Sequence, residues 1–296
     1  VIAPMITPIA APATPVLKAA AGMLGTVKWT ASLGRVTKTV DDEDLIVQSL
    51  LMAINNALKM VAANVPEQRI LVIIDGLDKI HEEERAAELF IQSNLIARLA
   101  CCLIVACPFA LRHHVSIGSS LGFSSVPSLM NEPVMDQVKP AEHGPGVAFF
   151  CQLFEHRVRD LDNPEKLITR VHLEKLAYYS GGRARDFVKL IRILSELAWD
   201  EDIGTATEAV VDETLDTLRR EREMGIHRGH IDLLRGVMAD SEHRLPKDPL
   251  THELLRYSLL LPYSNGSEWF YPHPLLLMHM LVTRNDGSSA SSASSR

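Results

Sequence analysis

The sequence predicts an α/β fold, in which a parallel sheet covered by helices is followed by a helical region and a hairpin. Three observations predict it. Two short, continuous apolar runs, residues 70–74 and 101–108, are separated by a helix-like stretch, which is typical of strands buried on both faces of a parallel sheet. From about residue 147 the sequence is typical of successive helices. Near the end, Asn265-Gly266 stands between two apolar runs, and this dipeptide is the strongest short hairpin signal.

Composition limits the class of protein. The 296 residues are 47% hydrophobic and 23% charged, so the chain is an ordinary globular protein that is long enough for two domains. The net charge of −7 argues against a general polyanion binder. The four cysteines form no disulfide framework, which predicts a reducing, cytoplasmic setting. No run reaches the roughly 18 apolar residues that a membrane span needs, so we expect no membrane contact.

The first part of the chain is predicted to alternate between strands and helices. Residues 26–38 alternate apolar and polar side chains, which indicates a half-exposed strand. Residues 41–68 are predicted to be a helix, with apolar side chains on one stripe. The other expected elements of this part are a short strand and linker (1–22), a strand (70–74), an acidic helix (about 81–99), a strand (101–108) and a third strand near 133–138.

The second part is predicted to be helical until the hairpin. The expected helices are 147–161, 172–181, 182–201 and 208–225. The Ser-rich stretch 285–296 is typical of a disordered tail or linker. The predicted boundaries are therefore 1–146 for the sheet domain, 147–222 for a helical domain, 223–284 for helices and hairpin, and 285–296 for the tail.

Two carboxylates follow the first buried strand at a spacing that suits metal chemistry. Asp75 comes directly after the apolar run and Asp78 three residues later. A carboxylate at a strand tip can hold Mg²⁺ through its water shell, and a second acid can polarise an attacking water. The alternative is that both acids cap the helix expected to begin near His81.

This pattern resembles the Walker B element of P-loop ATPases of the AAA+ and STAND groups. The strand 101–108 resembles the strand that carries sensor 1, and Gly182 and Arg185 match the Gly-x-x-Arg element at the start of the sensor 2 helix. The segment 268–276, EWFYPHPLL, resembles the end of the winged helix in bacterial STAND-like ATPases. The resemblance covers roughly residues 40–282, in the expected order.

The resemblance implies an incomplete parallel P-loop NTPase sheet, an all-α lid (147–222) and a C-terminal winged helix (223–284). It implies ATP and Mg²⁺ as cofactors. Asp75 would organise Mg²⁺, Asp78 would position or activate water, and Arg185 would reach the nucleotide phosphates, with Arg183 as a competitor of equal chemistry. The implied function is the ATP-binding region of a nucleotide-dependent switch protein.

Two departures from the family pattern qualify this expectation. Cys107 stands where the polar sensor 1 residue is expected, and thiols are weak hydrogen-bonding groups. The motif G-x-x-x-x-G-K-[ST] is absent from the sequence, and we expect it upstream of Val1. ATP hydrolysis is therefore expected only when such a loop is joined to the chain. Without it, the strand 101–108 should have an open edge unless another segment, such as 1–9, fills the gap. The alternative is a degenerate scaffold that does not hydrolyse ATP and binds protein partners.

The C-terminal part does not favour nucleic acid. Residues 227–296 contain seven Arg or Lys and seven Asp or Glu, a net charge of zero, whereas DNA-binding modules usually carry a basic patch. Trp269, Phe270 and Tyr271 are expected to pack in a core rather than to stack on bases. We therefore favour protein partners or self-assembly over DNA.

Two further patterns are expected to carry no chemistry. Gly118–Gly122 fits G-x-S-x-G around Ser120, but no strand precedes it and no helix follows, as a serine hydrolase requires. The pairs His113/His114 and His227/His230 lack Cys or carboxylates at ligand spacing, so no zinc site is expected.

Overall fold

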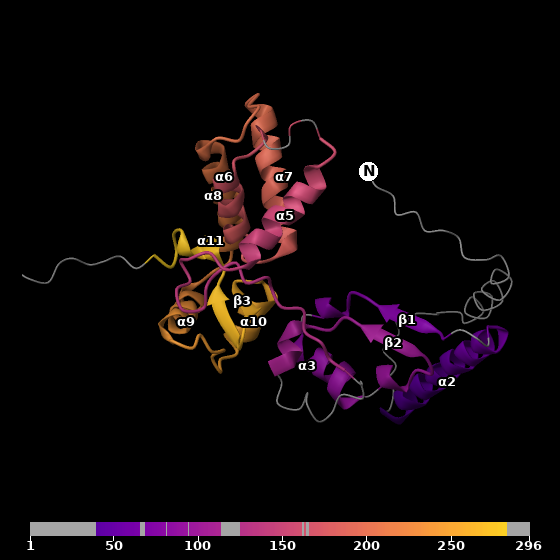
Figure 1. Cartoon of the computed structure of the whole chain (residues 1–296). Helices are drawn as coiled ribbons and strands as arrows, with labels where there is room; N and C mark the ends of the chain where they lie inside the picture. Colours follow the sequence, from indigo (N-terminus) through magenta and orange to yellow (C-terminus); the bar gives the residue numbers. More distant parts are fainter. Residues whose placement is uncertain are drawn as a thin grey trace, which may run out of the picture. The chain divides into compact units, whose positions relative to one another are not determined.

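A computed structural model describes residues 40–65, 69–80, 82–93, 95–113, 125–161, 163 and 166–282. The chain divides into two compact units, Val1–Val126 and Pro127–Arg296, which are taken one at a time below (Figure 1). The predicted elements in 1–22 and 26–38, the tail 285–296 and the Gly118–Gly122 motif lie outside the described residues.

The first unit contains the predicted parallel strand pair. Strand β1 (Leu71–Ile74) pairs in parallel with β2 (Cys102–Val105), in a register that sets Leu71 beside Cys102 and Ile74 beside Val105. The predicted helix before β1 is confirmed as α2 (Val40–Asn64). The elements follow the order expected of an α/β fold: helix, strand, helical connection, strand.

The connection between the strands differs from the single acidic helix predicted for 81–99. It contains the short pieces η1 (Leu77–Lys79), α3 (Glu83–Ala87), η2 (Glu88–Gln92, a π-turn) and η3 (Ile96–Arg98). Ser93 accounts for the interruption. Its Oγ donates to the Leu89 carbonyl at 2.9 Å and accepts from the Leu95 N–H at 3.4 Å. A side chain that bonds its own backbone in this way offers an alternative to continuing the helix.

Among the residues that the structure describes in this unit, the strand pair is covered on one face only. Ala86, Ala87, Phe90, Ile91 and Leu111 form a small core, against which Val105 of β2 packs. On the other face Leu71, Ile73 and Ile104 are 52%, 66% and 55% exposed. The prediction of strands buried on both faces is therefore wrong for the part of the chain that is described. No third strand joins this pair among those residues.

Helix α2 contacts the rest of the first unit through polar side chains. Asn55 Nδ2 donates to the Arg98 carbonyl at 3.1 Å, and Asn55 Oδ1 accepts from the Ala100 N–H at 2.7 Å. Leu51 is buried, whereas Leu45 and Met52 are more than half exposed.

The expectation that no segment is long and apolar enough for a membrane span is wrong here, because residues Leu45–Asn64 meet that test with a mean hydropathy of 1.5. One such helix is weak evidence for a membrane segment.

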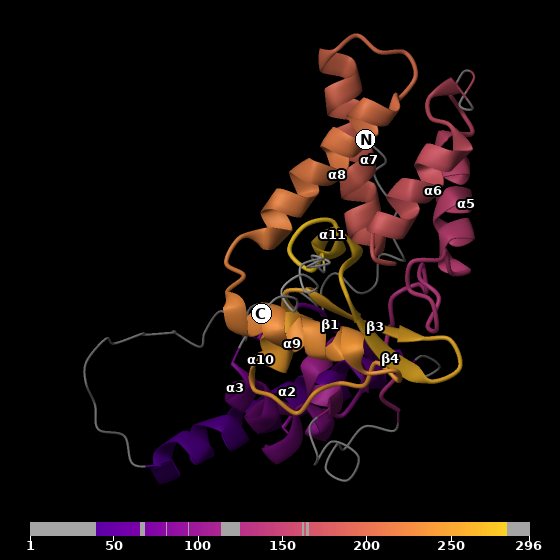
Figure 2. The same ribbon diagram turned by 90° about the vertical axis from the view of Figure 1, so that its left-hand side faces the viewer.

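The second unit contains four packed helices at the positions predicted. They are α5 (Gly146–Val158), α6 (Arg170–Tyr179), α7 (Ala184–Asp200) and α8 (Glu208–Glu223). Helices α5 and α6 pack together, as do α6 and α7, and α7 and α8 (Figures 1 and 2). Threonine hydroxyls cap two of them: Thr169 Oγ1 accepts from the His172 N–H at the start of α6, and Thr207 Oγ1 accepts from the Val210 N–H at the start of α8.

Two helices and the predicted hairpin follow. They are α9 (Arg228–Ala239), α10 (Leu250–Arg256), β3 (Leu260–Ser264) and β4 (Glu268–Pro272), before the short α11 (Pro274–Leu277). Strands β3 and β4 are antiparallel, and Gly266 takes a φ of +112° in the turn between them, which glycine tolerates. Asn265 Oδ1 accepts from Trp269 Nε1 at 2.5 Å. The Asn-Gly signal thus predicted the hairpin correctly.

Residues 127–146 belong to the second unit, although the sequence analysis placed them with the sheet domain. The strand predicted near 133–138 is wrong: Asn131 makes an isolated bridge to Tyr263, and Met135 makes one to His143. Val134 and Met135 are fully buried in the core of the second unit. Their burial against the hairpin and the bundle takes the place of pairing with β1 or β2.

A large core unites the helices and the hairpin of the second unit. Trp269 is fully buried and stacks on Tyr263 with ring centroids 4.7 Å apart. Phe270 and Tyr271 are also buried, so the prediction that these aromatic residues pack in a core is confirmed. The largest fully buried side chains there include Phe150, Phe187, Met135, Leu176, Leu190, Leu215, Leu218, Leu234, Leu254 and Leu260.

Candidate functional site

The two predicted acids lie at the carboxyl end of β1. Asp75 follows the last residue of the strand and is exposed; its Oδ1 accepts from the Gly76 N–H at 2.8 Å. Gly76 takes a φ of +89°, and the chain then turns into η1 with the exposed Asp78 in its first turn. Helix α3 has Glu82 as its N-cap residue, so neither aspartate caps it. Both carboxylates are open to solvent at the sheet edge where α/β folds bind ligands.

The parallel pairing brings Cys107 toward Asp78. Cys107 follows β2, whose backbone continues alongside β1 because the Ala106 N–H donates to the Ile74 carbonyl at 3.0 Å. Burial raises the pKa of the Cys107 thiol, and the nearby negative charge of Asp78 raises it further. Cys107 is therefore a neutral thiol at pH 7. Among the described residues no group of three or more His, Cys, Asp or Glu side chains is placed to hold a metal ion. Mg²⁺ at Asp75 would depend mainly on water ligands.

A surface pocket of about 600 Å³ lies beside this edge, in the connection between the strands. Its charged lining is balanced: Lys79 and Arg85 face it together with Glu82 and Glu88, and Arg85 forms an ion pair with Glu82. A triphosphate carries several negative charges and gains little from a wall of zero net charge. The pocket therefore does not supply a phosphate cradle.

The two predicted arginines of the second unit have different surroundings. Arg183 is the N-cap residue of α7, and its Nη1 donates to Asp186 Oδ2 at 2.6 Å. Arg185 lies in the first turn of α7, is exposed, and forms no ion pair within the described part of the chain. The guanidinium of Arg183 is thus committed to Asp186, whereas that of Arg185 is open to a ligand.

Asp186 is the centre of a buried charge cluster that the sequence analysis missed. It is 3% exposed, although it sits in the first turn of a helix. Arg222 of α8 donates through Nη2 to both of its oxygens, at 2.6 and 2.5 Å. His273, which is fully buried after β4, places Nε2 3.4 Å from Asp186 Oδ2. One carboxylate therefore joins α7, α8 and the end of the hairpin.

The protonation states of the cluster follow from its contacts. Burial alone would raise the pKa of the Asp186 carboxyl, but the hydrogen bond from His273 and the charges of Arg222 and Arg183 hold it well below its usual range. Burial lowers the pKa of His273 to about 4, against the opposing effect of Asp186. His273 Nδ1 accepts from the Leu275 N–H, so the neutral ring carries its proton on Nε2, facing Asp186. At neutral pH the cluster is an ionised aspartate, two arginines and a neutral histidine.

A glycine turn positions this cluster. Gly181 and Gly182 take φ values of +64° and +77°, and the Tyr263 hydroxyl donates to the Gly181 carbonyl at 2.9 Å. A Cβ at Gly182 would overlap the carbonyl oxygen of Glu132, so only glycine fits there. The turn fixes the start of α7 against the hairpin and segment 131–135.

One sequence signal could have found the cluster. Asp186 lies on the same stripe of α7 as Leu190 and Ile193, at positions i, i+4 and i+7. An aspartate on the apolar stripe of a helix is buried, and a buried carboxylate needs a cationic partner. The sequence could not name Arg222 or His273 as those partners.

Comparison of the chain with protein-family models, with curated proteins and with solved structures finds no match.

Proposed function

We propose that this chain is the ATP-binding region of a nucleotide-dependent switch protein of the AAA+/STAND kind. Asp75 would organise Mg²⁺, Asp78 would position water, and Arg185 would contact the phosphates from α7. The observation that carries the proposal is the parallel register of β1 and β2, which sets Asp75, Asp78 and Cys107 at one edge of the sheet.

The chemistry of this edge is compatible with Mg²⁺. Asp75 uses one oxygen for the Gly76 N–H, which leaves the other for a water of the metal's shell. Mg²⁺ commonly keeps several waters and takes one or two carboxylates together with the phosphates of its nucleotide. The sequence lacks a phosphate-binding loop of the G-x-x-x-x-G-K-[ST] type. Binding by this chain is therefore expected to be weak and dependent on Mg²⁺.

The second unit would act as the responding part. Helices α5–α8 correspond in the proposal to the lid, and α9, α10 and the hairpin to the winged helix. The Asp186 cluster ties these parts together, so a movement that begins at Arg185 on α7 would reach the hairpin through Asp186 and His273. Protein partners are proposed in preference to DNA, because the aromatic residues of the hairpin are buried. All four cysteines are free thiols, which supports the proposed cytoplasmic setting.

Isothermal calorimetry of Mg-ATP binding tests the proposal. We expect Asp75→Asn and Arg185→Ala each to weaken binding about tenfold, as for loss of one charged contact. Matched controls are Glu88→Gln, an exposed acid of the first unit, and Arg192→Ala, an exposed arginine further along α7. Both controls should leave the affinity unchanged. Binding that is equal without Mg²⁺, or that neither site variant weakens, would overturn the assignment.

A second candidate is a scaffold that binds protein partners and does not hydrolyse ATP. It is favoured by the commitment of Arg183 to Asp186 and by the neutral thiol of Cys107 at the sensor 1 position. Trp199, 86% exposed at the end of α7, is a residue of the kind that dominates protein interfaces. Absence of Mg-ATP binding by a folded chain would favour this candidate.

A further inference from the structure

The start of α9 is capped by histidines. The backbone N–H groups in the first turn of a helix need acceptors, which Ser, Thr, Asp or Asn usually provides. Here His227 Nδ1 accepts from the Gly229 N–H at 3.2 Å, and His230 Nδ1 accepts from the His227 N–H at 3.4 Å. We call these two side chains the histidine cap.

The two rings are held close together. Their centroids are 3.7 Å apart and the rings are stacked, 23° from parallel. His230 is 3% exposed, and its buried Nε2 has no hydrogen-bond partner, although Glu253 Oε2 of α10 lies 3.6 Å away. The neutral ring of His230 therefore accepts at Nδ1 and points an unpaired Nε2–H toward a carboxylate.

We propose that the histidine cap is a proton-operated latch on the start of α9, at the junction between the helical bundle (α5–α8) and the helix–hairpin part (α9, α10, β3 and β4) of the second unit. A ring nitrogen that accepts a hydrogen bond cannot also carry a proton. Uptake of a proton from solvent by either ring puts an N–H against a backbone N–H and removes one cap. Histidine is the side chain whose ordinary titration falls between pH 5 and 8.

Two electrostatic effects oppose the protonated state and one favours it. A positive charge is unfavourable at a helix N-terminus, and two charged rings 3.7 Å apart repel each other. Glu253 favours protonation of His230, because the charged ring can pair with it. At low pH His230 would thus lose its hydrogen bond in the cap of α9 and gain an ion pair with Glu253 of α10. The junction therefore has two distinct arrangements.

Other charged groups lie on the elements packed against α9. Glu253 Oε2 lies 3.6 Å from His230 Nε2 and would form an ion pair with the protonated ring. Arg228 pairs with Asp232 on α9 itself. The remaining titratable or charged groups of α9, α10 and β4 are Arg235, His252, Arg256, Glu268 and Tyr271, and the connection after α9 carries Asp240, Glu242, His243, Arg244, Lys247 and Asp248.

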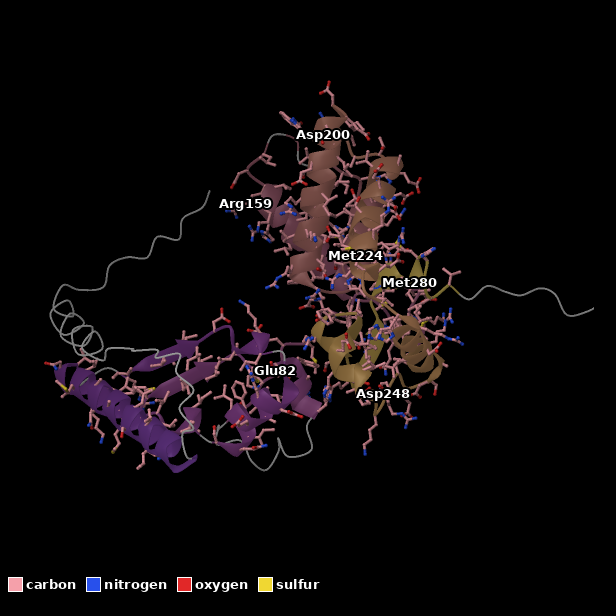
Figure 3. The ribbon with its side chains drawn as sticks, turned by 180° about the vertical axis from the view of Figure 1, so that it is seen from behind. Glu82, Arg159, Asp200, Met224, Asp248 and Met280 are labelled. Atoms are coloured by element: carbon pink, nitrogen blue, oxygen red, sulfur yellow. The ribbon has the colours of Figure 1, made fainter. Side chains whose placement is uncertain are left out.

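The position of the latch gives it a mechanical consequence. Helix α8 ends at Glu223 and α9 begins at Arg228, so three residues and the cap residue join the bundle to the helix–hairpin part. Met224 marks this junction in Figure 3, and Gly225 takes a φ of +82° within it. Loss of the cap would free the first turn of α9 and so lengthen the connection between α8 and α9.

Amide hydrogen exchange, measured by NMR on the whole chain at pH 7.5 and pH 5.0, tests the latch. After correction for intrinsic exchange, we expect the protection of the His227 and Gly229 amides to fall about tenfold at the lower pH, as for loss of two caps. The His172 and Val210 amides, which threonine hydroxyls cap, are internal controls and should keep their protection. Equal protection of the His227 and Gly229 amides at both pH values would overturn the proposal.

Two variants distinguish the effect of proton uptake by the histidine rings from the effect of altering the structure of the cap. His227→Asn with His230→Gln keeps an acceptor at both positions but cannot take up a proton, and it should show no pH dependence. A loss of protection equal to that of the unmodified chain would also overturn the proposal.

Because His230 is buried, Glu253→Gln provides a second test that leaves both rings in place. It should move the opening to lower pH, and an unchanged midpoint would contradict the role of Glu253.

Discussion

The parallel strand pair of this protein is the more apolar of its two strand pairs, yet it is the less buried. Leu71 and Ile73 of β1 are more than half exposed, whereas Leu260 and Leu261 of β3 are fully buried. The antiparallel pair is joined by a short turn, and part of its cover comes from α9 and α10, which are close to it in sequence. A parallel pair needs a long crossover and cover on both faces, which must come from several distant segments. Apolar sequence therefore predicts where a strand forms, whereas the surrounding elements decide how far it is buried.

Asp75 and Asp186 differ in burial in the same way as the two strand pairs. Asp75 ends an exposed strand and is open to ligands, while Asp186 lies under three cationic or polar side chains. The acid with a functional pattern is accessible, and the acid at the centre of the second unit is structural. Their replacement should have opposite consequences for binding and for stability.

The largest expected effect is that of Asp186→Ala. It should lower the free energy of unfolding of the second unit by about 3–5 kcal/mol, because Arg183 and Arg222 would remain largely buried without their counter-ion. Urea unfolding, followed by the near-UV circular dichroism of the buried aromatic residues, measures this change. Asp75→Ala is the matched control and should change the stability by no more than about 0.5 kcal/mol. Equal effects of the two substitutions would contradict the contrast.

A somewhat smaller effect is expected from pH, through His273. Its pKa is lowered to about 4 by burial, from the ordinary 6.5. Below pH 6.5 the unfolded chain takes up a proton that the folded chain does not accept until about pH 4. The stability of the second unit should therefore fall by about 3 kcal/mol between these values, and His273 should contribute no change above pH 6.5.

Urea midpoints at pH 7, 6, 5 and 4 measure this dependence. His273→Gln should remove most of it, so the difference between the two curves isolates His273 from the other histidines. Parallel curves for the two proteins would contradict a buried, neutral His273.

The elements that sequence could predict are those with local causes. The strand 70–74, the helices of the second unit and the Asn-Gly hairpin each follow from patterns within about 20 residues. The Asp186 cluster joins residues 36 and 87 positions apart, which periodicity cannot relate. For the same reason the sequence, which favoured Arg185, left Arg183 as a competitor of equal chemistry, and the contact of Arg183 with Asp186 sets the two apart. The uncovered face of β1 and β2 could not be predicted either, because its pattern is that of a buried strand.

The smallest expected effect is that of Ile73→Ala, in the uncovered face. Ile73 is 66% exposed, so truncation removes little buried surface and should cost no more than about 0.5 kcal/mol. Leu261→Ala, at a fully buried position of the other strand pair, should cost about 2–5 kcal/mol. Both costs can be measured by chemical unfolding, in which hydrogen exchange of the strand amides reports the stability of each unit separately. A cost for Ile73→Ala equal to that of Leu261→Ala would mean that the face is covered in solution. If that cost grew with protein concentration, the cover would be a second copy of the chain; if it did not, the cover would come from the same molecule.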